Sequence, residues 1–137
     1  RQEKSYRAFG TELGRDATPA EADLPHFIDL EKDFHGKEAM IAKGIRSKCV
    51  TLLIDGPDDA DPWGREALYN GDTKVGRLTS GGYSVHFEKS IGMGYVSPEL
   101  ANVGQKLSVK MQGKLWDAEI VQDSPYDPKN ATIRVDG

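Results

Sequence analysis

The chain has 137 residues, of which 37% are hydrophobic, enough for the core of one small domain with or without an appendage. Its 18 basic and 22 acidic residues give a formal net charge of -4, and no Lys/Arg cluster could neutralise a run of phosphates, so we expect no nucleic-acid partner. Because no apolar run approaches the roughly 20 residues of a membrane span and no secretory signal opens the chain, we expect no membrane contact and a cytoplasmic location.

The first 46 residues predict short elements separated by turns. Polar and apolar positions over residues 1–13 alternate as in one or two turns of an amphipathic helix, with Glu3 and Arg7 spaced to pair on it. Thr18, placed before Pro19, is typical of a capped single helical turn.

Two further elements are expected before residue 47. The apolar residues of 27–30 fit a short strand. Residues 37–43 predict a helix, because Gly36 and Gly44 bound it. We expect this helix to link the opening segment to the strand-rich remainder of the chain.

From residue 47 onward the hydrophobic pattern has period two and predicts about eight short strands. They are expected near residues 48–55, 66–70, 73–79, 82–88, 91–97, 106–112, 115–122 and 131–135. Hairpin turns are expected at 70–72 and 112–114, where Asn-Gly-Asp and Gln-Gly-Lys stand. The fold class is therefore mainly β, and we predict an antiparallel β-barrel of Greek-key or jelly-roll type over residues 47–137.

The stretch from Val75 to Val96 is the most informative part of this pattern. Its Ser-Gly-Gly-Tyr-Ser sequence at 80–84 predicts a corner, since paired glycines supply the positive φ angles of tight turns. Gly92 and Gly94 alternate with larger residues and predict a strand that another backbone or ring approaches closely. We interpret it as an interface strand.

No set of residues matches a known catalytic or metal-binding pattern. The acidic loop 55–62 lacks the alternating spacing of a calcium loop, and His26, His35 and His86 are too far apart in sequence for a helical zinc pair. Cys49 lies in an apolar run and is expected to be a buried, unreactive thiol. We therefore predict no catalytic residue and no metal site.

Five blocks of the sequence together resemble one known family. They read RQEKSYRAFGTEL at 1–13, TPAEADL at 18–24, DFHGKEA at 33–39, VGRLTSGGYSVHFEKSIGMGYV at 75–96 and PYDP at 125–128. In this order and spacing they are similar to the C-terminal part of the glycine-cleavage T-protein (aminomethyltransferase) family, and most of all to its dimethylglycine and sarcosine dehydrogenase branch. The resemblance implies that residues 1–46 are the tail of a folate-binding domain and a linker, and that residues 47–137 are the C-terminal barrel.

The resemblance also implies a division of labour within a longer protein. An N-terminal portion of the same chain would hold FAD and oxidise an N-methyl amine, and the T-protein-like part would pass the one-carbon unit to tetrahydrofolate. The chain starts without methionine, and we expect a C-terminal piece that is inactive alone. A stand-alone aminomethyltransferase, a demethylase built on the folate fold and a non-catalytic binding module remain as alternatives.

Two residues are predicted to contact folate. In the family, the position two residues after the leucine of the Glu-Ala-x-Leu block usually carries a tyrosine or tryptophan that packs on tetrahydrofolate, and His26 stands there. An imidazole can also stack, although a surface histidine in a linker is the alternative reading. Glu3 could accept hydrogen bonds from the pterin edge at the wall of the cavity, or it could serve only in a helix ion pair.

Overall fold

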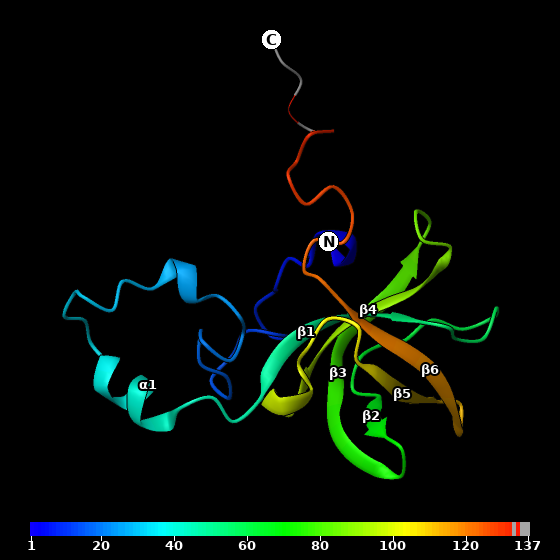
Figure 1. Cartoon of the computed structure of the whole chain (residues 1–137), viewed down its shortest axis with the longest axis horizontal. Coiled ribbons are helices and arrows are strands. Elements are labelled where there is room, and N and C mark those ends of the chain that lie inside the picture. The colour runs from blue at the N-terminus through cyan, green and yellow to red at the C-terminus, as the bar shows by residue number, and fades with distance from the viewer. Residues whose placement is uncertain (133, 135–137) are drawn as a thin grey trace.

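In a computed structural model, which describes residues 1–132 and 134, the later part of the chain folds into a closed antiparallel barrel (Figure 1). Within the described residues, six strands form the barrel: β1 Lys48–Ile54, β2 Ala67–Asn70, β3 Thr73–Ser84, β4 Lys89–Val96, β5 Lys106–Met111 and β6 Lys114–Val121. One α-helix, α1 Lys37–Lys43, and three short 3-10 helices, η1 Gln2–Lys4, η2 Pro25–Phe27 and η3 Pro98–Leu100, complete the described elements.

The strand order around the barrel is β1-β4-β3-β2-β5-β6, with β6 hydrogen-bonded back to β1. Strands β2, β3 and β4 follow one another as hairpins, and β1 lies beside β4 after a long connection, which is a Greek key. The prediction of a mainly β fold with an antiparallel Greek-key barrel is confirmed.

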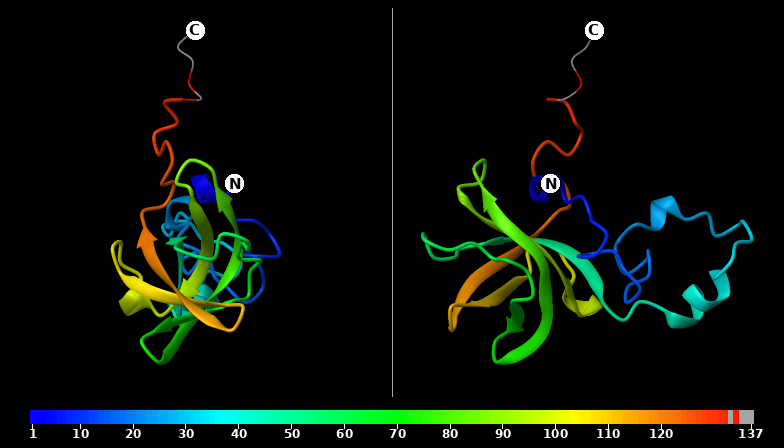
Figure 2. Two further views of the ribbon diagram at one scale, coloured as in Figure 1. Left: turned by 90° about the vertical axis from the view of Figure 1, so that its right-hand side faces the viewer. Right: turned by 180° about the vertical axis from the view of Figure 1, so that it is seen from behind.

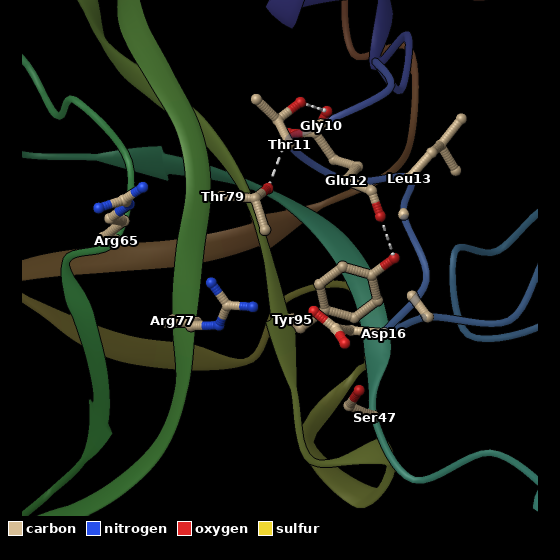
Figure 3. A pocket seen from close by; sticks show the side chains of 12 residues that line it. Gly10, Thr11, Glu12, Leu13, Asp16, Ser47, Arg65, Arg77, Thr79 and Tyr95 are labelled. Carbon is tan, nitrogen blue, oxygen red and sulfur yellow. Dashed lines mark hydrogen bonds between the residues drawn. The ribbon is translucent and has the colours of Figure 1, made fainter.

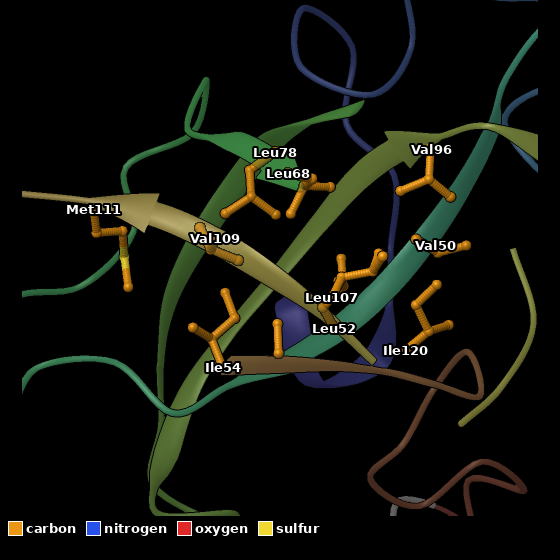
Figure 4. Packing of buried hydrophobic residues seen from close by; sticks show 11 residues of the cluster. Val50, Leu52, Ile54, Leu68, Leu78, Val96, Leu107, Val109, Met111 and Ile120 are labelled. Carbon is orange, nitrogen blue, oxygen red and sulfur yellow. The ribbon is translucent and has the colours of Figure 1, made fainter. Parts of the chain in front are cut away.

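Aliphatic side chains from all six strands fill the barrel (Figure 4). Leu52, Ile54, Leu68, Leu78 and Val109 have no exposed surface. Alternation along each strand brings these residues to the inner face, as expected for a small barrel whose interior is filled by side chains. This packing makes the barrel a rigid platform for the segments outside it.

The number of strands and the corner at 80–84 were predicted wrongly. Strand β3 runs without a break from Thr73 to Ser84, with a register shift near Thr79, and the chain reverses only at residues 85–88. Gly81 has no positive φ; a Cβ added there would lie 2.5 Å from the Pro62 side chain. The glycine thus serves close packing and not a turn. Of the strand predicted at 131–135, residues 131–132 form a turn, whereas 133 and 135 lie outside the described residues.

The glycine-based hairpin turns were predicted correctly. Gly71 and Gly113 have φ angles of 62° and 75°, and Gln112 also takes a positive φ of 51°. The close backbone approach predicted for strand β4 is confirmed, because a Cβ on Gly94 would meet the Arg77 carbonyl oxygen of the neighbouring strand β3 at 2.5 Å. Its outward-facing residues Met93 and Tyr95 pack with Cys49 and Ala17, so the opening segment covers the strand from outside.

The segment before the barrel is less regular than predicted. Residues 1–13 form the 3-10 helix η1, a turn and an isolated bridge between Phe9 and Leu13, and the strand expected at 27–30 is absent because residues 25–27 form η2. Helix α1 has the predicted bounds, with Gly36 and Gly44 at its ends in conformations with positive φ. Tertiary contacts with the barrel replace helical hydrogen bonds in the opening residues.

Residues 1–24 lie against the barrel, whereas residues 25–45, including α1, project away from it (Figures 1 and 2). The C-terminal segment after β6 runs back past the opening residues, where Tyr126 N donates to the Glu3 carbonyl at 3.2 Å. In the part of the chain that the structure describes, no helix is both long enough and apolar enough to cross a membrane.

Candidate functional site

A pocket of about 470 Å³ opens where the opening segment meets the end of β6. We call it the His26 pocket. It is lined by Lys4, Ser5, Tyr6, Arg7, Leu13, Asp23, Leu24, His26, Phe27, Asp123 and Ser124. Apolar walls with a few converging polar groups, in a volume of this size, are the usual setting of a small-molecule site.

Arg7 forms the polar floor of the His26 pocket. Its side chain is only 4% exposed, and its Nη2 pairs with the Asp123 carboxylate at 2.7 Å. Nε donates to the Ala22 carbonyl at 3.0 Å, and Nη1 donates to the Ser5 carbonyl at 2.7 Å. Because three contacts fix the guanidinium, this polar floor is formed before any ligand arrives.

His26 lies at the rim of the same pocket, as the second residue of η2. Its ring is exposed and tilts against the ring of Phe27, with the centroids 4.3 Å apart and the planes at 43°. Pro25 begins this 3-10 turn and fixes its backbone. Two aromatic rings therefore stand together at the pocket entrance, with faces available for stacking.

Glu3 lies outside the residues that line the His26 pocket. Its carboxylate accepts a hydrogen bond from the Ser84 hydroxyl at the end of β3. The predicted helical pair of Glu3 with Arg7 is wrong, because the 3-10 helix η1 ends at Lys4, before Arg7, and Arg7 pairs with Asp123 instead. The two predicted folate residues, His26 and Glu3, therefore do not share the His26 pocket.

Glu12, which the sequence analysis did not single out, is the main link between the opening segment and the barrel (Figure 3). Its buried carboxylate accepts hydrogen bonds from the Thr79 hydroxyl at 2.7 Å and from the Ser80 hydroxyl, both on β3. Thr11 Oγ1, the Ala8 amide and Arg1 Nη1 donate to its other oxygen at 2.6, 3.0 and 2.9 Å.

Two opposing effects act on the pKa of Glu12. Desolvation by burial raises it, whereas the hydrogen bonds, first that from Ser80, lower it, and the result is a pKa of about 2. The carboxylate is therefore ionised at neutral pH. It accepts hydrogen bonds both from the opening segment and from strand β3. Tyr95 adds a further link, since its hydroxyl donates to the Glu12 carbonyl at 2.7 Å.

Glu21 holds the turn that precedes η2. The Thr18 amide donates to its carboxylate at 2.9 Å while the Glu21 amide donates to the Thr18 hydroxyl at 3.2 Å, so the pair forms a capping box. Hydrogen bonds from Arg46 are the largest cause that lowers the pKa of Glu21 to about 2. The cap predicted at Thr18 is confirmed, and the Thr-x-x-Glu spacing is the sequence signal for it.

The projecting residues 25–45 carry large apolar side chains that the barrel does not cover. Phe27 is 79% exposed, and Leu30, Phe34, Ile41 and Ile45 are exposed as well. An exposed apolar set of this kind on one projecting segment marks an interaction surface. It adjoins the entrance of the His26 pocket through Phe27.

The described residues contain no group of three or more His, Cys, Asp or Glu side chains that could hold a metal ion. Cys49 is 2% exposed, and burial raises its pKa to about 12, so the prediction of a buried, unreactive thiol is confirmed. The His26 pocket itself presents an ion pair, a histidine and aromatic walls. Such an arrangement can bind and orient a flat polar ligand.

Comparison with known proteins relates the chain to one family. Residues 48–127 match the family described as "Glycine cleavage T-protein C-terminal barrel domain". The chain is 39% identical over 144 aligned residues to the mitochondrial dimethylglycine dehydrogenase of Rattus norvegicus, covering 100% of this chain and 17% of that protein. It is 38% identical over 122 residues to an aminomethyltransferase of Desulfitobacterium hafniense, covering 86% of this chain and 33% of that protein.

A solved structure supports the fold. The crystal structure of glycine cleavage system aminomethyltransferase T from Bartonella henselae superposes with a TM-score of 0.81 at 24% identity, covering 93% of this chain and 37% of that chain. The present chain therefore spans only about a sixth to a third of the lengths of its curated relatives.

Proposed function

Since the chain belongs to the glycine-cleavage T-protein family through its C-terminal barrel domain, we propose that it is the C-terminal part of a tetrahydrofolate-binding domain in an FAD-dependent N-methyl amine dehydrogenase. The amine would be of the dimethylglycine or sarcosine type. The similarity to a dimethylglycine dehydrogenase over 100% of the chain supports this branch. The part described would help to transfer a one-carbon unit to tetrahydrofolate.

The His26 pocket is the observation that carries this proposal. It joins the opening segment to the end of the barrel, and its fixed Arg7–Asp123 pair and two aromatic rings suit a flat, hydrogen-bonding ring system such as a pterin. His26 would stack on the ligand. Glu3 lies outside this pocket, with its carboxylate held by Ser84 at the end of β3, so we propose His26 and not Glu3 as the contact to the ligand bound there.

The exposed apolar residues of 25–45 support a partner within the same protein. We place the N-terminal portion of the parent chain against them, because burying several large apolar side chains is the main driving force of such contacts. This portion would carry FAD and the reacting groups. The chain alone would then lack catalytic activity, and neither nucleic acid nor a membrane would be its partner.

The compartment we propose is the cytoplasm, where the single Cys49 would stay reduced. The rat relative is named as mitochondrial, and fractionation of the source cells would decide between the two locations.

A stand-alone aminomethyltransferase is the second candidate function, and the 38% identity to the Desulfitobacterium hafniense enzyme favours it. Less support exists for a demethylase on the same fold or for a non-catalytic module. The sequence that precedes Arg1 in the parent protein discriminates: a glycine-rich dinucleotide fingerprint in it would identify the flavin branch.

Isothermal titration of the full-length parent protein with tetrahydrofolate tests the proposal. We expect binding, and we expect His26→Ala to weaken it about threefold to tenfold, the range of one lost aromatic contact. His35→Ala is the matched control, because His35 is exposed on the same projecting segment but lines no described pocket near His26. Equal affinities of wild type and His26→Ala would return His26 to a linker role, and a folded parent that releases no heat would favour the non-catalytic module.

A further inference from the structure

A second pocket, of about 320 Å³, lies on the other side of Leu13 from the His26 pocket. We call it the Arg65 pocket. Its polar lining includes Glu12, Asp16, Ser47, Arg65, Arg77 and Thr79. Figure 3 shows the two arginines on the barrel side and Asp16 on the side of the opening segment, next to the ring of Tyr95.

No carboxylate of the described residues forms an ion pair with the two arginines of this pocket. Among the described residues, neither Arg65 nor Arg77 lies within ion-pair distance of a carboxylate, whereas Glu12 is paired with Arg1 at 2.9 Å. Both side chains belong to exposed residues. In a protein of net charge -4, two neighbouring guanidinium groups without a carboxylate partner form an unusual positive site.

A second hollow of about 310 Å³ extends the positive surface. It shares Ser47, Arg77 and Tyr95 with the Arg65 pocket and adds Lys74 and Arg46. Arg46 is neutralised by Glu21, but Lys74, like the two pocket arginines, has no carboxylate at ion-pair distance in the described part of the chain. Among the described residues, three cations without an ion-pair partner, Arg65, Arg77 and Lys74, thus line the two adjoining hollows.

Backbone hydrogen bonds hold Arg65 in a strained conformation. Arg65 has a φ of 78°, a conformation that non-glycine residues rarely adopt. The Arg65 amide donates to the Leu78 carbonyl at 2.7 Å, and the Leu78 amide returns a bond to the Glu66 carbonyl at 2.8 Å. The neighbouring Glu66 carboxylate is occupied by two backbone amides, at 2.7 and 2.8 Å, so it accepts there and does not neutralise Arg65.

We propose that the Arg65 pocket binds a small multivalent oxyanion, either phosphate or carboxylate groups of a small ligand. Arg77, which lines both hollows, would form a bidentate contact, and Arg65 and Lys74 would contact the oxygens on either side. The Ser47 hydroxyl stands in the same lining as a further donor, whereas the Thr79 hydroxyl already donates to Glu12. Asp16 would keep the anion on the arginine side of the pocket by repulsion.

Titration calorimetry of the full-length protein at low ionic strength tests this site, with pyrophosphate as the phosphate probe and glutarate as the dicarboxylate probe. We expect at least one probe to bind, and we expect Arg77→Gln to weaken binding about tenfold or more. Lys110→Gln on β5 is the control, since it removes one exposed positive charge that lines neither hollow. Binding of pyrophosphate alone, of glutarate alone or of both identifies which oxyanion the site accepts.

The proposal is overturned if neither probe binds to the folded protein, or if Arg77→Gln and Lys110→Gln weaken binding equally. Thermal unfolding of both variants shows whether they are folded. Because neither probe contains a pterin and the His26 pocket is tested separately with tetrahydrofolate, failure of one proposal leaves the other standing.

Discussion

Glu12 shows how one side chain can decide whether two parts of a chain stay together. Its carboxylate has almost no exposed surface and accepts hydrogen bonds from residues on both sides of the junction. This role is hard to predict from the sequence, since a glutamate among polar residues is usually exposed to solvent. Its partners on β3, Thr79 and Ser80, are more than 60 positions away, and only the closed barrel brings them to it.

Glu12→Gln is expected to destabilise the protein by on the order of 3 kcal/mol at neutral pH, in line with the fall of its pKa from the ordinary 4.5 to about 2. Because the folded state lowers this pKa, the stabilisation is complete above pH 4.5 and is lost as the pH falls from there toward 2. Urea unfolding of wild type and variant between pH 7 and pH 3 measures it. Glu99→Gln, at an exposed site in η3, is the control. Equal stability of Glu12→Gln and wild type at pH 7 would contradict this account.

At the scale of elements, the sequence predicts what local chemistry determines. Helix α1 and the two glycine hairpins were predicted correctly, because the glycines that bound α1 and the Asn70-Gly71 and Gln112-Gly113 pairs act within a few residues. The continuous course of β3 was missed, since the same Gly81-Gly82 pair suits a turn or a close approach. Only the position of Pro62, which packs against Gly81, distinguishes the two.

Gly76→Ala is expected to destabilise the barrel by more than about 2 kcal/mol, because the new Cβ would lie 2.0 Å from the Tyr95 carbonyl oxygen on the neighbouring strand. Gly82→Ala is a matched control in the same strand: no atom lies within 4 Å of its Cβ position and its φ is not positive. Chemical denaturation of both variants compares them. The packing argument fails if the two substitutions shift the unfolding midpoint equally.

At the scale of the whole molecule, residues 1–24 lie against the barrel and residues 25–45 project away from it. The contact of residues 1–24 with the barrel was not visible in the sequence, where only the change to period two at residue 47 stands out. The Arg7–Asp123 ion pair joins positions 116 residues apart, so no local pattern could have predicted the floor of the His26 pocket. His26 was predicted from the family resemblance, whereas the residues that line the pocket beside it were found only in the structure.

The packing of the opening segment on β4 makes Cys49 a reporter of the whole domain. A thiol reagent at pH 8 is expected to modify Cys49 only as fast as the domain opens, because burial raises the thiol pKa to about 12 and excludes the reagent. Glu12→Ala should raise the labelling rate by loosening the cover. Labelling of native wild type at the rate of a free thiol would contradict the described burial.

Strand β4 is enclosed from every direction. Its edges are hydrogen-bonded to β1 and β3, its inner face lies in the barrel core, and its outer face lies beneath the opening residues. In heavy water its amides should thus be the last to exchange their protons, and any event that admits solvent to them must have dismantled both the barrel and its cover.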